Sequence, residues 1–73
     1  MPTEVRAHIT GTVWKIEKAV GVAVAEGEVI IILESMKMEM PIEAPASGTI
    51  VAIHVKETEA VDEGKIVALI DEG

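Results

Sequence analysis

A single lysine stands between two methionines near the middle of the chain, in the run Met36-Lys37-Met38. Its side chain is a primary amine on a flexible four-carbon stem, so an acyl group joined to it as an amide would end a long movable arm. An exposed lysine is mostly protonated at neutral pH and does not acylate itself, so a separate enzyme must activate the acyl group. Taken alone, Lys37 is an ordinary surface lysine, and only its neighbours single it out.

Those neighbours are unusual for a turn. Turns prefer Gly, Asn, Asp and Pro, and an exposed methionine forgoes apolar burial. Core packing is the competing interpretation of Met36 and Met38, but their symmetric placement about the lysine argues against it. Glu34, Glu39 and Glu43 are most simply solvated residues flanking the turn, and the alternative is that they dock a basic protein surface.

No other group of residues indicates catalysis or metal binding. The chain has no cysteine, and His8 and His54 are far apart without a carboxylate relay, so we interpret both as surface residues. The sequence shows no nucleophile–base pair, no paired carboxylates in a cleft and no phosphate-binding glycine loop. Trp14, the one aromatic residue, is interpreted as a packing residue that could also serve as a contact.

The charge and hydropathy of the chain exclude two classes of binding partner. Six basic and thirteen acidic residues give a net charge of −7, which opposes binding to a phosphate backbone. The longest apolar run, Val29 to Leu33, is far too short to span a membrane. We therefore expect a soluble protein that binds neither nucleic acid nor membrane. We expect a cytoplasmic location, which the lack of cysteine neither supports nor excludes.

The segments around the lysine form an internal repeat with a shift of 37 residues. Gly11-Thr12-Val13 recurs as Gly48-Thr49-Ile50, and Val24-Ala25-Glu26-Gly27 recurs as Val61-Asp62-Glu63-Gly64. We predict a single domain over 1–73 whose half-repeats, about 11–35 and 48–72, are related by a pseudo-two-fold axis. Lys37 lies at their junction.

Glycine and proline divide each half into short segments rich in Val and Ile, which favour strands. A helix over 28–40 is the alternative, because Glu, Leu, Met and Lys favour helices. Three consecutive isoleucines, and a second β-branched run at the equivalent position, favour a strand instead. We predict strands near 4–9, 12–18, 22–25, 29–35, 38–43, 49–55, 59–62 and 66–71.

The expected fold class is all-β, a flattened barrel or sandwich of two four-stranded antiparallel sheets with internal pseudo-two-fold symmetry. Lys37 would then lie at the tip of a hairpin between the strands 29–35 and 38–43. Alternation along 38–43 would place Met38, Met40 and Ile42 on one face.

The chain resembles, over essentially its whole length, the biotinyl domain family, the biotin carboxyl carrier modules of acetyl-CoA, propionyl-CoA and pyruvate carboxylases and of transcarboxylase. The resemblance is carried by Glu34-Ser35, Met36-Lys37-Met38, Pro41-Ile42-Glu43-Ala44-Pro45 and Ser47-Gly48-Thr49. It implies that biotin is attached covalently to Lys37, and that the ligase and the carboxylase use Met36 and Met38. Glu34, Ser35 and Glu39 would be possible partner contacts.

The resemblance also implies a carrier with no catalytic group, which is modified by a biotin protein ligase and moves carboxybiotin from a biotin carboxylase site to a carboxyltransferase site. The family more often has alanine at the position of Ser35, and Gly-Asp where this chain has Gly21-Val22 and Thr58-Glu59. We therefore expect a looser or differently typed turn at 57–60.

Two other functions compete with this one. A lipoyl carrier domain shares the fold, but that family typically has Asp before the lysine and Ala after it. An unmodified β-domain that serves as a scaffold or binding module would leave Met36 and Met38 unexplained.

Overall fold

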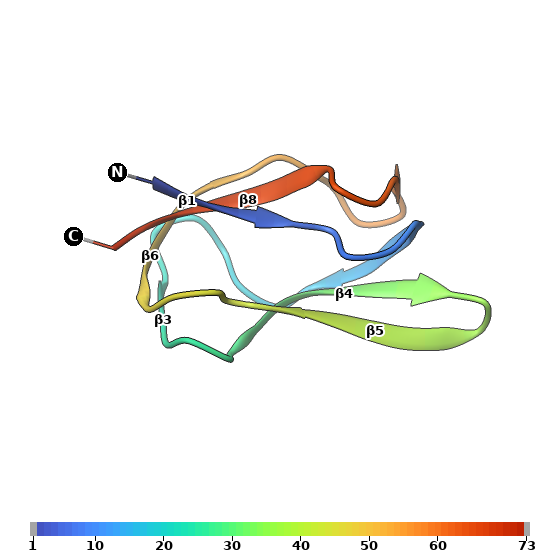
Figure 1. Cartoon of the computed structure of the whole chain (residues 1–73), viewed down its shortest axis with the longest axis horizontal. Helices are drawn as coiled ribbons and strands as arrows, with labels where there is room; N and C mark the ends of the chain where they lie inside the picture. The colour runs from blue at the N-terminus through green and yellow to red at the C-terminus, as the bar shows by residue number, and fades with distance from the viewer. Residues whose placement is uncertain (1, 73) are drawn as a thin grey trace.

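The computed structural model describes residues 2–72, which form eight strands and no helix. The strands are arranged in two four-stranded antiparallel sheets, with the orders β1-β8-β6-β3 and β5-β4-β2-β7 (Figure 1). The predicted all-β class with two such sheets is confirmed. The strands are β1 (Pro2–Arg6), β2 (Gly11–Ile16), β3 (Ala23–Val24), β4 (Val29–Ser35), β5 (Met38–Glu43), β6 (Gly48–Ile53), β7 (Ala60–Val61) and β8 (Ile66–Asp71). Residues 2–72 contain no helix that could cross a membrane.

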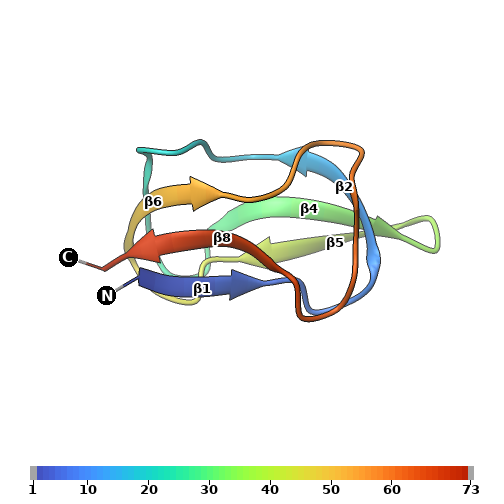
Figure 2. The same ribbon diagram turned by 90° about the horizontal axis from the view of Figure 1, so that it is seen from above.

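The 37-residue repeat is visible as a pseudo-two-fold symmetry between the sheets. Each strand of the first half has its counterpart in the other sheet: β1 corresponds to β5, β2 to β6, β3 to β7 and β4 to β8. Exchanging counterparts converts one strand order into the other. Figure 2 shows β1, β8 and β6 lying over β5, β4 and β2.

The symmetry extends to irregularities in the ladders. The β2–β4 pairing shifts between Val13 and Lys15, and the β6–β8 pairing shifts between Ile50 and Ala52. The residues passed over, Trp14 and Val51, correspond in the repeat, and both are exposed. A β-bulge bends a strand and increases its twist, so the two halves curve at the same point.

The buried core has the same pseudo-two-fold symmetry as the strands. Among the described residues, fourteen of the fifteen buried apolar side chains form seven pairs separated by 37 positions. Each half therefore contributes the same set of positions to one shared core, which suits a chain too small to support two. The pairs are Val5 with Ile42, Ala7 with Ala44, Val13 with Ile50, Val24 with Val61, Ile30 with Val67, Ile31 with Ala68 and Leu33 with Ile70.

Val55 is the buried residue without an apolar counterpart, since Lys18 stands at the equivalent position. The Lys18 side chain is partly buried, and its Nζ donates to Glu28 Oε2 at 3.1 Å. Glu28 Oε1 also accepts the Ala25 backbone N–H at 2.6 Å. Lysine can cover apolar surface with its stem while its charge stays paired at the surface, so the position remains compatible with the core.

The strands over 29–35, 38–43 and 66–71 occur where they are predicted, and the alternative of a helix over 28–40 is wrong. The boundaries predicted as 4–9, 12–18, 22–25, 49–55 and 59–62 are wrong by one to three residues. The largest error concerns β1, which ends at Arg6. Arg6 pairs with Ile66, the first residue of β8, so later residues have no strand to pair with.

The expectation of a looser or differently typed turn at 57–60 is also wrong. The Glu59 N–H donates to the Lys56 carbonyl at 3.1 Å, as the Val22 N–H donates to the Ala19 carbonyl at 3.2 Å. Thr58 has φ of 75°, close to the 94° of its counterpart Gly21. The second half therefore keeps the hydrogen-bonded turn of the first and accepts a left-handed threonine in place of glycine.

The domain is elongated, with extents of 36 × 17 × 17 Å. The tip of the β4–β5 hairpin lies at one end of the long axis, and the two chain ends lie together at the other (Figure 1).

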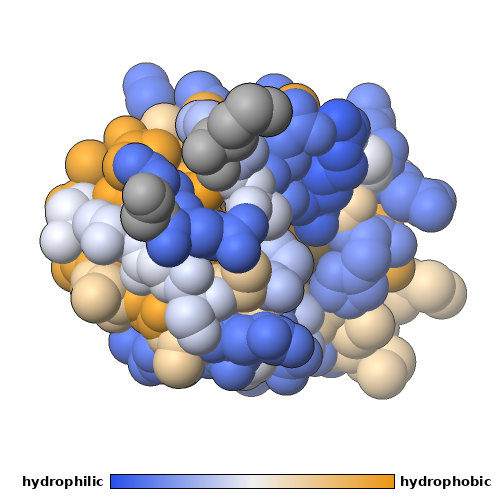
Figure 3. Space-filling view, turned by 60° about the vertical axis from the view of Figure 1, so that its left-hand side comes forward, coloured by the Kyte–Doolittle hydropathy of each residue, from blue (hydrophilic) through white to orange (hydrophobic). Residues whose placement is uncertain are grey.

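On the face turned toward the chain ends, hydrophobic residues reach the surface in separate groups with hydrophilic ones between them (Figure 3).

Candidate functional site

The predicted hairpin tip is present, and it is as short as a hairpin allows. β4 and β5 remain paired as far as Ser35 and Met38, which leaves only Met36 and Lys37 to reverse the chain. Their φ angles are 52° and 66°, so both are left-handed. Positive φ at both central residues is the pattern of a type I′ turn, whose right-handed twist matches that of the flanking strands.

This turn has residues that do not favour its conformation. Type I′ turns prefer Asn-Gly, Asp-Gly or Gly-Gly, and a left-handed residue other than glycine costs about 1–3 kcal/mol. Because the ladder on either side closes the loop, Met36 and Lys37 are held there by pairing rather than by propensity. Sequence reasoning located the hairpin but missed its left-handed backbone, since neither residue type signals it.

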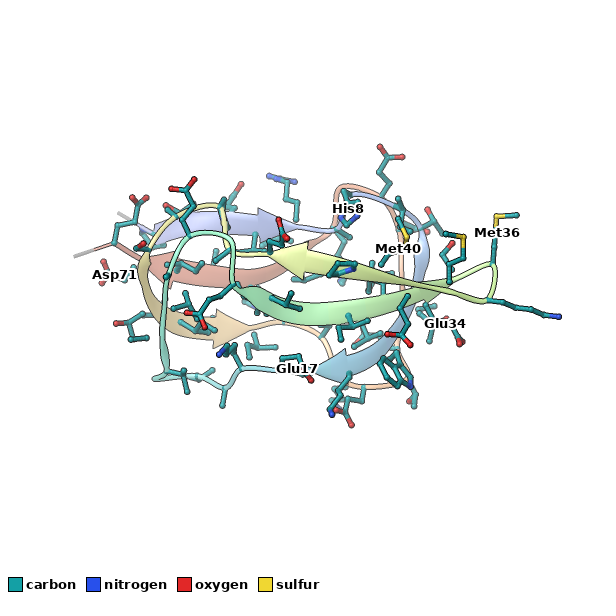
Figure 4. All side chains as sticks on the ribbon, turned by 90° about the horizontal axis from the view of Figure 1, so that it is seen from below. His8, Glu17, Glu34, Met36, Met40 and Asp71 are labelled. Carbon is teal, nitrogen blue, oxygen red and sulfur yellow. The ribbon has the colours of Figure 1, made fainter. Side chains whose placement is uncertain are left out.

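The two flanking methionines lie in solvent. Met36 is 91% exposed and Met38 62% exposed, so the core-packing interpretation of these residues is wrong. Lys37 is also exposed and forms no hydrogen bond or ion pair with another described residue. Figure 4 shows the Met36 side chain standing off the end of the hairpin, away from the body of the domain. The lysine amine is therefore accessible to a second protein.

Below the tip, β5 returns to the core. Met38, Met40 and Ile42 alternate as predicted, with exposure falling along the strand from Met38 to the partly buried Met40 and the buried Ile42. Met40 packs against the main core cluster and pairs in register with Leu33 of β4. The hairpin is thus anchored by its inner residues and presents only its last turn to solvent.

The tip end of β4 lies against β2. A Cβ added to Gly11 would lie 2.8 Å from the carbonyl oxygen of Glu34, closer than side chains normally come. Glycine at this position therefore lets the β2 backbone lie against the end of β4. Glu34 and Ser35 lie directly before the turn, where Ser35 is partly buried and Glu34 is exposed.

Acidic side chains surround the tip. Glu34 of β4 pairs in register with Glu39 of β5, and both are exposed, as is Glu43 farther along β5. Like charges directly opposite each other in a sheet are destabilising. The hairpin therefore presents a positive amine and two exposed thioethers above a pair of carboxylates.

The remaining candidates lie on the surface outside the two-residue turn. His8 and His54 are exposed, as interpreted from the sequence, and Trp14 is 50% exposed on its bulge. Residues 2–72 enclose no detected pocket, and no three of their His, Asp or Glu side chains are grouped so as to hold a metal ion. The site is a protrusion, suited to being inserted into another protein.

Comparison with known proteins is consistent with this geometry. Residues 1–70 match the biotin/lipoyl family model, described as biotin-requiring enzyme. Pyruvate carboxylase of Bacillus subtilis (strain 168) is 39% identical over 96% of this chain, which spans only 6% of that protein. The biotin/lipoyl attachment protein of the same organism is 38% identical over 86% of each chain.

The fold also matches a solved carboxylase structure. The crystal structure of Kluyveromyces lactis urea carboxylase superposes with a TM-score of 0.93 and 37% identity over 97% of this chain, which corresponds to 6% of that chain. The family model matches nearly the whole chain. The small Bacillus subtilis protein aligns over most of its own length as well as most of this chain. The chain belongs to the biotin/lipoyl domain family, the biotin-requiring enzymes.

Proposed function

We propose that this chain is a biotin carboxyl carrier, a single domain with biotin bound as an amide to Nζ of Lys37. The observation that carries the proposal is an exposed, unpaired lysine in a two-residue turn between exposed Met36 and Met38. Its similarity to pyruvate carboxylase and urea carboxylase supports biotin as the group carried.

The amide requires an external enzyme. A biotin protein ligase would use ATP to convert the biotin carboxyl group to an acyl-adenylate, with release of pyrophosphate. The neutral amine of Lys37 would then attack the carbonyl carbon, release AMP and lose a proton as the amide forms. Among the described residues, none is positioned to deprotonate or orient that amine. In this proposal the domain is the substrate of the ligase, and the ligase supplies the catalytic groups.

The shape of the domain suits a carrier. The β4–β5 turn, which holds Lys37, lies at one end of a body 36 Å long, with the chain ends at the other (Figure 1). The short turn fixes the start of the arm, while the lysine stem and the biotin chain remain flexible. Tethering then holds biotin at an effective concentration on the order of millimolar near the biotin carboxylase and carboxyltransferase sites that it would serve.

We assign recognition by these enzymes to the residues around the tip. Met36 and Met38 offer flexible, polarizable apolar contacts, a type of surface that adapts to more than one partner. Glu34 and Glu39, with Ser35 between Glu34 and the turn, would dock a basic rim of the ligase or the carboxylase.

The test is to express the chain with a biotin protein ligase and measure its intact mass and avidin binding. We expect one biotin on the wild type and on Lys56→Arg, and none on Lys37→Arg, which keeps the charge but removes the primary amine. Biotin on Lys37→Arg would refute the attachment site. A lipoyl group in place of biotin, in cells that supply both ligases, would refute the function.

A further inference from the structure

The β4–β5 hairpin contains three methionines with graded access to solvent. Met36 is 91% exposed in the turn, Met38 is 62% exposed at the start of β5, and Met40 is partly buried against the core. A thioether sulfur is oxidised according to its exposure, so these three sulfurs should differ in reactivity although they are close in sequence.

We propose that Met36 is a site of reversible oxidation by peroxides, with Met38 as a slower second site, and that this oxidation controls whether Lys37 is biotinylated. In the reaction the sulfur attacks one peroxide oxygen and the O–O bond breaks. For hydrogen peroxide the products are methionine sulfoxide and water, with the sulfur oxidised by two electrons and the peroxide reduced. A methionine sulfoxide reductase, with a dithiol as the two-electron reductant, would return the thioether and release the oxygen as water, leaving a disulfide.

The domain itself should tolerate this change. The Met36 side chain stands in solvent beyond the last residue pair of the hairpin, so a polar oxygen on its sulfur stays hydrated and disturbs no packing. Met40 is the contrast, because its sulfoxide would place a polar group against the buried cluster of the core.

Oxidation of Met36 should instead weaken the productive complex between the domain and the ligase. This part of the proposal rests on the proposed function. A ligase that reaches Lys37 must come close to Met36, which adjoins it in the turn. A sulfoxide covered by that enzyme loses its hydration unless a donor happens to face it. The two-residue turn, closed by the Ser35–Met38 pair, gives the backbone little freedom to turn the side chain away.

The first measurement is the order of oxidation. The folded chain is treated with a limiting amount of hydrogen peroxide, and the hairpin peptide is sequenced by mass spectrometry over time. We expect sulfoxide to form at Met36, then Met38, then Met40, and to form equally at all three in urea. Equal rates in the folded chain, or Met40 reacting first, would overturn the proposal.

The second measurement is biotin transfer by a purified ligase before and after treatment. We expect kcat/KM to fall roughly tenfold after oxidation, which is about 1.4 kcal/mol, while the thermal unfolding midpoint stays unchanged. Methionine sulfoxide reductase should restore the rate. Met40→Leu should remain sensitive to peroxide, and the Met36→Leu, Met38→Leu double variant should keep its own untreated rate after treatment.

The outcomes separate this inference from the function on which it rests. If the untreated chain accepts biotin and the oxidised chain accepts it equally well, the oxidation control is refuted and the carrier function stands. If the untreated chain accepts no biotin, both fail.

Discussion

Glu34 and Glu39 lie directly opposite each other across the β4–β5 hairpin, in the second residue pair below the turn that holds Lys37. Both carboxylates are exposed, and no described cation is paired with either. A like-charge cross-strand pair is unfavourable, so the folded domain gains nothing from it. Binding of this carboxylate pair to another protein would account for its presence beside Lys37.

Glu39→Lys should therefore stabilise the domain while weakening its use by the ligase. Replacing the repulsion by attraction to Glu34 should raise the free energy of unfolding by about 0.2–1 kcal/mol, measured in urea by circular dichroism. The kcat/KM for biotin transfer should fall. Glu43→Lys is the control, because Glu43 faces Val29 and the same change in charge meets no opposing carboxylate. An equal gain in stability from both variants would contradict this account.

Met36→Asn should relieve the strained turn. Asparagine adopts left-handed backbone more readily than methionine and is preferred in type I′ turns, so the free energy of unfolding should rise by up to about 1 kcal/mol. The same substitution removes an exposed thioether beside Lys37, and biotin transfer should slow. Met38→Asn, in the first residue pair of β5 rather than in the turn, should not be stabilising. A loss of stability in Met36→Asn would argue against the left-handed turn.

The Glu28 carboxylate should make stability depend on pH. Its pKa is lowered from the ordinary value of 4.5 by the Ala25 backbone N–H, and further by the hydrogen bond and charge of Lys18. Because the unfolded chain binds this proton more readily, the contribution of Glu28 is present above pH 4.5 and is lost as pH falls through the lowered pKa of the folded state.

The check is the thermal unfolding midpoint of Glu28→Gln relative to wild type. The variant should be less stable at about pH 7, and this difference should shrink toward about pH 3. Glu26→Gln makes the same change in charge at an exposed neighbour and should show less of this pH dependence. A difference between wild type and Glu28→Gln that stays constant with pH would exclude the proposed linkage.

Gly48→Ala and Gly11→Ala should destabilise the fold to different extents. A Cβ at Gly48 would lie closer to the Asp71 carbonyl oxygen than one at its repeat counterpart Gly11 would lie to that of Glu34. Overpacking of this kind costs about 1–3 kcal/mol, and the closer contact with backbone should cost more. The free energy of unfolding of both variants is measured in urea. A larger decrease for Gly11→Ala than for Gly48→Ala would show that the two halves are not packed as described.

The sequence alone predicts most of this architecture because the information is local and repeated. β-branched runs, turn glycines and the shift of 37 residues are all readable from residue types, and they locate the eight strands and the hairpin around Lys37. The strand boundaries depend on long-range pairing instead. β1 ends at Arg6 because β8 begins at Ile66, and that pairing joins opposite ends of the chain.

The backbone of the tip was decided only by the tertiary structure. Met36 and Lys37 have no intrinsic preference for positive φ, and they adopt it because β4 and β5 stay paired up to Ser35 and Met38. In the same way, Thr58 takes the left-handed turn of Gly21 because the paired halves require one geometry there. Residue types determined which lysine stands out and which segments form strands. Long-range pairing determined how that lysine is held, since the cost of a strained turn is met by the ladder that closes it.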